Sequence, residues 1–214
     1  MIFLHIWKNI TICDKFYVMN TVDFQIIEGK KPVLLSAPHA FLHKRPKLSG
    51  AYRQGERFTD DIVKDVCTLT GAWGIVLSAS IDYDPNYHTI KRNKYKQEVQ
   101  KICKENKINQ FIDIHGMADG SDFDLGIFYP TRFIKSKSFA DIVRGEIGKG
   151  ELYGINSALF RFRDDNEETL GEFVASKMRI PSIQIEISRY IREDEGLRES
   201  FVKNLSDIVD KRFV

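Results

Sequence analysis

Six short segments of the chain are rich in apolar and β-branched residues, and each is bounded by Gly, Pro, Asp or Asn. Segments with this length and these boundaries are typical of β-strands. The predicted strands are Phe24–Ile27, 33–37, 75–79, 111–114, Leu125–Tyr129 and 183–187. Longer segments with a different spacing of apolar residues separate most of them.

In those longer segments the apolar residues recur every three or four positions, which indicates amphipathic helices. Helices are predicted over Thr59–Thr70, 88–106, 131–147, 168–176 and 194–213. Thr59 is expected to be the N-cap of the first helix, and Gly71 is expected to end it. Strands that alternate with helices predict a single α/β domain, with a mixed, mostly parallel sheet and helices on both of its faces.

The chain has 214 residues, which is the usual size of one domain. Residues 21–214 are expected to form it. Residues 1–20 are treated as an uncertain N-terminal leader, because the pattern of predicted strands and helices begins only after Met19. Met19 is an alternative initiator methionine. No apolar run is long enough for a membrane helix. Three cysteines without a CxxC pair fit a reducing compartment, so a cytoplasmic location is expected.

The charges argue against a nucleic-acid partner. With 32 basic and 30 acidic residues the net charge is +2, so no overall field attracts the protein to nucleic acid or to an anionic membrane. Segment 91–107 is locally basic, with seven basic and two acidic residues. A solvated helix face is the favoured interpretation, because no row of aromatic residues accompanies these charges.

Four polar residues lie where the predicted strands should be apolar or should end. His39 follows one strand, His115 closes another, Glu186 lies inside a third, and Glu56 precedes a helix. Ligands of open α/β sheets bind beyond the carboxyl ends of the strands. Two imidazoles and one carboxylate form a catalytic zinc set that leaves a position for water. A mid-strand carboxylate is costly to bury, and a role as general base beside a metal would explain Glu186.

Other interpretations of these residues stay open at this point. Either Asp60 or Asp61 could replace Glu56 as the carboxylate ligand, although both also suit the first turn of a helix. Glu186 could instead be the buried ion-pair partner of Arg189 or Arg179. Three further histidines, at positions 5, 43 and 88, have no assigned role.

Four short motifs resemble, in their order, those of the N-formylglutamate amidohydrolase-like proteins. They are Ser36-Ala-Pro-His-Ala40, Gly55-Glu-Arg-Phe-Thr-Asp60, Asp113-Ile-His-Gly116 and Gln184-Ile-Glu-Ile-Ser188. Proteins of this family are related to the zinc carboxypeptidases and have the phosphorylase/hydrolase-like fold. The resemblance spans residues 33–190, most of the chain.

The resemblance implies a zinc-dependent amidohydrolase that cleaves the C–N bond of an N-acyl amino acid or a related small amide. His39, Glu56 and His115 match the zinc ligands, and Glu186 matches the general base. Asp113 lies two residues before His115 on the same strand face. It is expected to orient one of the metal-binding side chains by contacting it without touching the metal itself. Asp60 is a further candidate for such a supporting role.

One segment departs from the family pattern. Where the formylglutamate enzymes have Asp-x-Asn-Arg, this chain has Asp84-Pro-Asn-Tyr87, so the arginine suited to a substrate carboxylate is replaced by Tyr87. Asn86, Arg161 and Arg163 are candidate substrate-binding residues, and Arg161 or Arg163 could supply the missing charge. A small or peptide-like substrate with an anionic group is expected. The alternatives are a carboxypeptidase-type or γ-glutamyl-polymer hydrolase, and a metal-free binding module on the same fold.

Overall fold

The computed structural model describes residues 18–45, 51–118, 120–130, 133–162 and 168–212. Among these, the strands are β1 (Val18–Asn20), β2 (Phe24–Ile27), β3 (Lys31–Ala37), β4 (His43–Lys44), β5 (Tyr52–Arg53), β6 (Ala72–Leu77), β7 (Gln110–Gly116), β8 (Leu125–Tyr129), β9 (Ser157–Arg161) and β10 (Ser182–Ile187). The helices are α1 (Thr59–Thr70), α2 (Lys94–Glu105), α3 (Ile134–Ile147), α4 (Leu170–Met178), α5 (Arg189–Glu193) and α6 (Glu195–Arg212), with short 3₁₀ turns η1 (Ile90–Arg92) and η2 (Gly150–Leu152).

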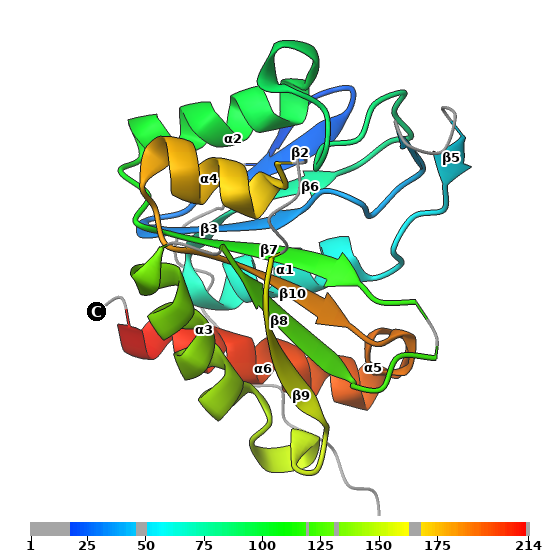
Figure 1. Cartoon of the computed structure of the whole chain (residues 1–214), viewed down its shortest axis with the longest axis vertical. Coiled ribbons are helices and arrows are strands. Elements are labelled where there is room, and N and C mark those ends of the chain that lie inside the picture. Colours follow the sequence, from blue (N-terminus) through cyan, green and yellow to red (C-terminus); the bar gives the residue numbers. More distant parts are fainter. Residues whose placement is uncertain (1–17, 46–50, 119, 131–132, 163–167, 213–214) are drawn as a thin grey trace, which may run out of the picture.

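Eight of the strands form one mixed sheet in the order β1-β2-β6-β3-β7-β10-β8-β9 (Figure 1). Its centre is parallel, because β3 pairs in parallel with both β6 and β7, and β7 pairs in parallel with β10. The pair β8–β9 is also parallel, whereas β1–β2, β2–β6 and β10–β8 are antiparallel. β4 and β5 form a separate two-stranded ribbon.

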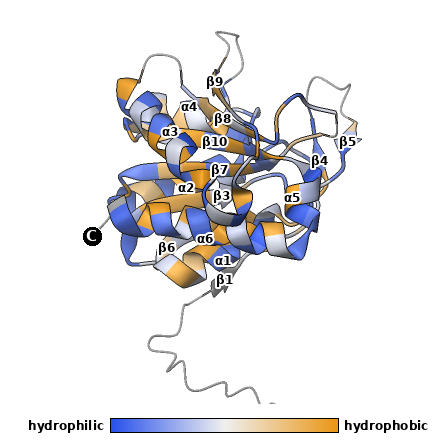
Figure 2. Ribbon diagram, turned by 90° about the horizontal axis from the view of Figure 1, so that it is seen from below, coloured by the Kyte–Doolittle hydropathy of each residue, from blue (hydrophilic) through white to orange (hydrophobic). Residues whose placement is uncertain are grey.

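Helices cover both faces of the sheet, with α2 and α4 on one side and α1, α3 and α6 on the other (Figures 1 and 2). The alternation along β10 explains the two cores: Ile183, Ile185 and Ile187 belong to the core beneath α3 and α6, so the residues between them face the opposite side. Leu34 and Phe111 belong to the second core, with apolar residues of α2 and α4. The predicted single-domain α/β architecture is therefore confirmed.

The six predicted strands and five predicted helical segments are all present, with changes at their ends. Thr59 is the first residue of α1 rather than its N-cap. Phe58 occupies the cap position at a φ of 66°, and the Thr59 hydroxyl donates to the carbonyl of Glu56, 2.7 Å away. Segment 88–106 is divided at Asn93, whose side chain caps α2 by accepting a hydrogen bond from the backbone N–H of Lys96 at 2.9 Å.

The N-terminal side of the sheet extends beyond the expected domain boundary. β1 pairs with β2 at residues 18–20, inside the range expected to be a leader, while residues 1–17 lie outside the described part of the chain. The predicted segment 194–213 is the helix α6, preceded by the short helix α5. Within the described ranges, no helix has the length and apolar character needed to cross a membrane.

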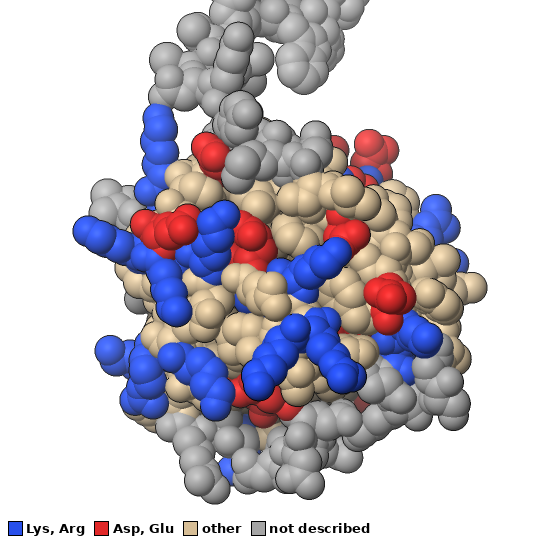
Figure 3. Space-filling view, turned by 90° about the horizontal axis from the view of Figure 1, so that it is seen from above, with Lys and Arg blue, Asp and Glu red and all other residues tan. Residues whose placement is uncertain are grey.

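The basic segment expected to be a solvated helix face becomes η1 and α2. Lys101 lies 3.2 Å from Glu98, and Lys94 lies 3.4 Å from Asp23. On the face shown in Figure 3, basic and acidic side chains are interspersed among uncharged ones. Some of the basic side chains of this segment thus have acidic neighbours.

Candidate active site

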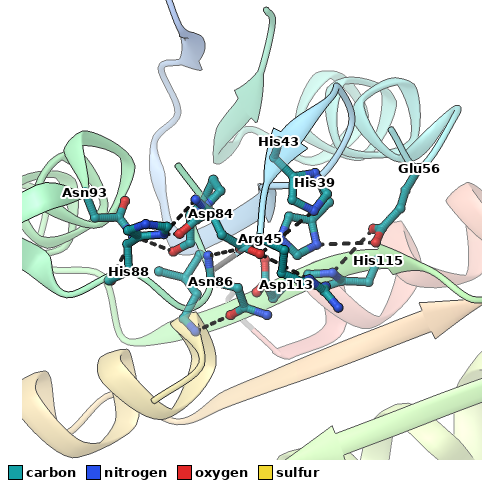
Figure 4. Close-up of polar contacts among 12 residues, drawn as sticks. His39, His43, Arg45, Glu56, Asp84, Asn86, His88, Asn93, Asp113 and His115 are labelled. Carbon is teal, nitrogen blue, oxygen red and sulfur yellow. Dashed lines mark hydrogen bonds and ion pairs between the residues drawn. The ribbon is translucent and has the colours of Figure 1, made fainter. Parts of the chain in front are cut away.

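The candidate residues gather at the carboxyl ends of β3, β7 and β10. Figure 4 shows His39, Glu56 and His115 close together there. His39 follows β3, His115 is the penultimate residue of β7, and Glu186 is in register with His115 on the neighbouring strand β10. Parallel central strands place these residues at one edge of the sheet, as the sequence analysis expected.

Glu56 reaches this edge because its loop is fastened to the segment after β3. The backbone N–H of Glu56 donates to the carbonyl of His39 at 2.8 Å. The chain passes so close to Ala40 that a Cβ atom on Gly55 would lie 2.3 Å from the Ala40 carbonyl oxygen. Only glycine fits at this position, so the Gly-Glu pair of the motif has a direct structural reason.

The Glu56 carboxylate lies between the two imidazoles. Its Oε1 is 3.3 Å from His39 Nδ1, and its Oε2 is 3.4 Å from His115 Nδ1. One ligand atom from each of the three residues lies within 4.8 Å of the other two. The backbone N–H of Gly116 donates to Glu56 Oε2 at 2.9 Å and fixes the carboxylate in this position.

Each histidine also contacts an aspartate through its other ring nitrogen, Nε2. His39 Nε2 is 2.9 Å from Asp84 Oδ1, and His115 Nε2 is 3.0 Å from Asp113 Oδ2. All four side chains are buried. With Nε2–H donating to a carboxylate, each histidine has its Nδ1 toward Glu56, where Nδ1 can bind a metal ion that takes the place of its proton.

The charges at this cluster favour a cation. Burial alone would raise the pKa of the Glu56 carboxyl, but the nearby His39 and His115 outweigh this effect and hold the pKa well below its usual range. Burial would lower the pKa of both histidines, yet the carboxylates around them raise it. In the absence of another cation, protons on the imidazoles balance these carboxylates.

The donor set fits a zinc ion. His39 Nδ1 is buried and makes no hydrogen bond of normal geometry within the described residues. Two imidazole nitrogens and one carboxylate, each held by a further partner, are the ligands and supports that zinc sites use. A divalent cation would also replace the protons that the two imidazoles otherwise hold.

Glu186 lies on the same face as His115, opposite the buried isoleucines of β10. It accepts a hydrogen bond from Gln184 Nε2 at 2.7 Å. Burial raises the pKa of its carboxyl, although the proximity of His115 partly opposes that shift. The two arginines considered as ion-pair partners have other contacts: Arg189 donates to Glu193 at 2.9 Å, and Arg179 lies over the ring of Phe133.

Two pockets adjoin the cluster. One, with a volume of 420 Å³, contains Glu56 and Gly116, and four arginines contribute to its lining: Arg53, Arg57, Arg189 and Arg192. Of these, Arg192 is a buried support, because its guanidinium donates to the carbonyls of Ile187, Arg57 and Met117. The other pocket, of 440 Å³, contains Glu186 and several phenylalanine rings.

The remaining predicted residues lie in different places. Asp60 is not part of the group of converging ligand atoms and forms a 2.6 Å ion pair with Lys64. Asn86 is buried, and its Oδ1 accepts a hydrogen bond from the backbone N–H of Leu170 at the start of α4. Arg161 is exposed at the end of β9, in the lining of the second pocket. Arg163 lies outside the described residues.

Sequence reasoning missed the role of Asp84 and the residues around it. Besides His39, the Asp84 carboxylate accepts from the backbone of Asn86 at 2.9 Å and from Arg45 Nε at 3.2 Å. His43 is stacked on His39, with ring centroids 4.0 Å apart. The Arg45 guanidinium also lies 5.1 Å from the centre of the Tyr87 ring. A positive charge is thus present beside Tyr87, the position at which the formylglutamate enzymes have an arginine.

Comparison with solved structures finds this fold in several hydrolases of low sequence identity. The catalytic domain of the N-acetylmuramoyl-L-alanine amidase CwlV from Bacillus (Paenibacillus) polymyxa var. colistinus is 15% identical, with a TM-score of 0.53 over 84% of this chain and 96% of that one. A bacteriophage poly-gamma-glutamate hydrolase is 15% identical, with a TM-score of 0.53 over 90% and 89%. The succinylglutamate desuccinylase of Chromobacterium violaceum is 12% identical, with a TM-score of 0.56 over 87% of this chain and 64% of that enzyme.

These likenesses establish the fold, which is the one that the resemblance implied. No protein-family model matches the chain, and no curated protein gives a significant match. The activity must therefore be argued from the residues of the site.

Proposed function

We propose that this protein is a metal-dependent hydrolase of amide bonds, with zinc as the metal and His39, Glu56 and His115 as its ligands. The observation that carries the proposal is the convergence of the Glu56 carboxylate and the two histidine Nδ1 atoms within 4.8 Å, while a carboxylate holds each Nε2. Three protein ligands are typical of catalytic rather than structural zinc sites.

A zinc ion bound there supplies Lewis acidity toward water and toward the carbonyl oxygen of the amide. The chain's own residues prepare that chemistry. By accepting from Nε2, Asp84 and Asp113 orient each imidazole with Nδ1 toward Glu56, where Nδ1 can bind the metal. The backbone N–H of Gly116 holds the Glu56 carboxylate, and the His39 carbonyl holds the Glu56 backbone N–H.

Glu186 acts as the general base in this proposal. Its carboxylate takes a proton from the attacking water, the C–N bond breaks, and the same proton passes to the departing nitrogen. A carboxylic acid and an amine are the products. Burial raises the pKa of Glu186, which brings it closer to the range that suits both steps.

The substrate is an N-acyl amino acid or a short peptide-like amide with an anionic group. The pocket beside Glu56 supports the anionic part of this proposal, since Arg53 and Arg57 are exposed at its rim and can pair with a carboxylate. The names of the proteins with the same fold describe amidases, a desuccinylase and a γ-glutamate hydrolase, which is consistent with an amide substrate.

Metal analysis of protein purified without a histidine tag tests the proposal. The wild-type chain should hold one zinc ion per molecule, and His39→Ala or His115→Ala should lose most of it while retaining a cooperative melting curve. Glu56→Gln should also lose zinc, whereas the matched variant Asp60→Asn should retain it, because Asp60 is paired with Lys64. Full zinc occupancy in both histidine variants would reject the site.

A further inference from the structure

The strand register creates a hollow beside Glu186. On the face that carries Glu186, the neighbouring position on β8 is Gly126, and the next position on β9 is Ala158. Residues paired in this way lie side by side across a sheet. A glycine and an alanine carry no large side chain here, so neighbouring aromatic rings can approach the strands next to the proposed general base.

Aromatic rings form the boundary of this hollow. Gln184 lies two residues before Glu186 on β10, on the same face of the sheet. It is paired with Phe128 of β8, and Phe128 is paired with Phe160 of β9. The Phe128 and Phe160 rings are stacked with their centroids 4.8 Å apart, and the Phe123 ring lies 4.7 Å from that of Phe160. All three rings are only partly buried, and together with Glu186 they line the 440 Å³ pocket.

Gly126 is required for this arrangement. A Cβ atom at position 126 would lie 2.8 Å from Phe123 Cε2 and 2.9 Å from Phe128 Cε2. Such contacts are too short for carbon atoms, so any side chain there would displace both rings. The hollow therefore depends on a residue that allows two aromatic side chains to approach the strand.

The charges in the pocket disfavour an acidic occupant. Glu186 and Glu172 are both part of the lining, and the buried Gln184 Oε1 has no hydrogen-bond partner among the described residues. A carboxylate placed next to Glu186 and Gln184 would meet an acceptor and negative charge, which Arg161 at the exposed end of β9 opposes only in part. A flat apolar ring would instead make the offset or edge-to-face contacts that aromatic side chains prefer.

We propose that this hollow is a specificity subsite that binds an aromatic side chain next to the scissile amide. The inference rests on the proposed function, and it names the substrate class: amides whose reacting residue carries a neutral aromatic group. The anionic group of the substrate then lies toward the arginine-lined pocket beside Glu56 rather than in the hollow.

Binding of non-hydrolysable carboxylates to the zinc-loaded protein tests the subsite without relying on turnover. Titration calorimetry should show 3-phenylpropanoate binding at least about tenfold more tightly than butanoate or glutarate, because only the phenyl group can be buried among the rings. Gly126→Ala should abolish this preference. Gly145→Ala is the matched control, since nothing lies within 4 Å of a Cβ atom at that position, and it should leave the preference unchanged.

A second variant covers the case in which Gly126→Ala does not fold. Phe123→Leu removes one partly exposed ring and should weaken 3-phenylpropanoate binding by about three- to tenfold while butanoate binding is unchanged. Equal affinities for 3-phenylpropanoate and glutarate, or an unchanged preference in both variants, would overturn the subsite. Hydrolysis of N-acetyl amino acids is measured separately: an aromatic preference in binding without any hydrolysis would instead overturn the proposed function.

Discussion

The carboxylate behind His39 offers a sharp test of how the site is organised. Asp84→Asn keeps the shape of the side chain but removes its charge. The contact between Asp84 Oδ1 and His39 Nε2 is 2.9 Å long, and both side chains are almost completely buried, so solvent does not screen it. In the wild-type protein this contact makes the imidazole a stronger donor and holds its orientation.

The expected loss is in metal affinity. Removal of such a partner typically weakens metal binding by about 10- to 100-fold, which is about 1.4–2.8 kcal/mol. Competition with a chelator of known affinity measures the zinc dissociation constant directly. Asp82→Asn is the matched control, because Asp82 is exposed two residues away and should leave zinc affinity unchanged. If folded Asp84→Asn protein bound zinc as tightly as the wild type, the argument for this support would be refuted.

Three further predictions concern residues around the cluster. Glu186→Gln should bind zinc and melt at the same temperature as the wild type, while its activity falls by about 100- to 10,000-fold. If its free energy of unfolding instead fell by about 3–5 kcal/mol with activity intact, Glu186 would be part of a buried ion pair. Gly116→Ala should weaken zinc binding in the chelator assay and lower the free energy of unfolding by about 1–3 kcal/mol. The reason is that a Cβ atom at position 116 would lie 2.9 Å from Glu56 Cβ and 2.7 Å from Arg192 Cζ. An unchanged zinc affinity would contradict this prediction. Burial lowers the pKa of His43 from 6.5 to about 4, so this histidine makes the stability of metal-free protein fall as the pH falls from 6.5 to 4. His43→Gln should show a shallower decline over that window in denaturant titrations, and parallel curves for the two proteins would speak against it.

Most of the sheet could be predicted because its central strands are short apolar runs with clear boundaries. β2 and β8 have the predicted ends, and the residues of β10 alternate between two faces as expected. β9 was missed, since Ser157–Arg161 is an edge strand with only partial burial and no strong alternation. Its parallel pairing with β8 depends on tertiary contacts that a local pattern does not contain.

Some residues of the candidate site could likewise be predicted from the sequence, and others could not. His39, His115 and Glu186 were recognisable because polar residues at strand ends conflict with the apolar pattern around them. Asp84 was not, because its contact with His39 joins residues 45 positions apart through a loop. The aromatic hollow likewise requires the register of β10, β8 and β9, which brings Gly126 beside Glu186.

Stoichiometric reconstitution tests the central claim most directly. Protein freed of metal by a chelator is titrated with zinc while hydrolysis of a panel of N-acyl amino acids is followed by the release of free amine. We expect activity to rise linearly to one equivalent of zinc and then to stay constant, while Glu186→Gln takes up the same single equivalent and remains inactive. Amide hydrolysis that is equally fast in the metal-free protein, or a chain that binds zinc at His39, Glu56 and His115 but hydrolyses none of these amides, would contradict the account.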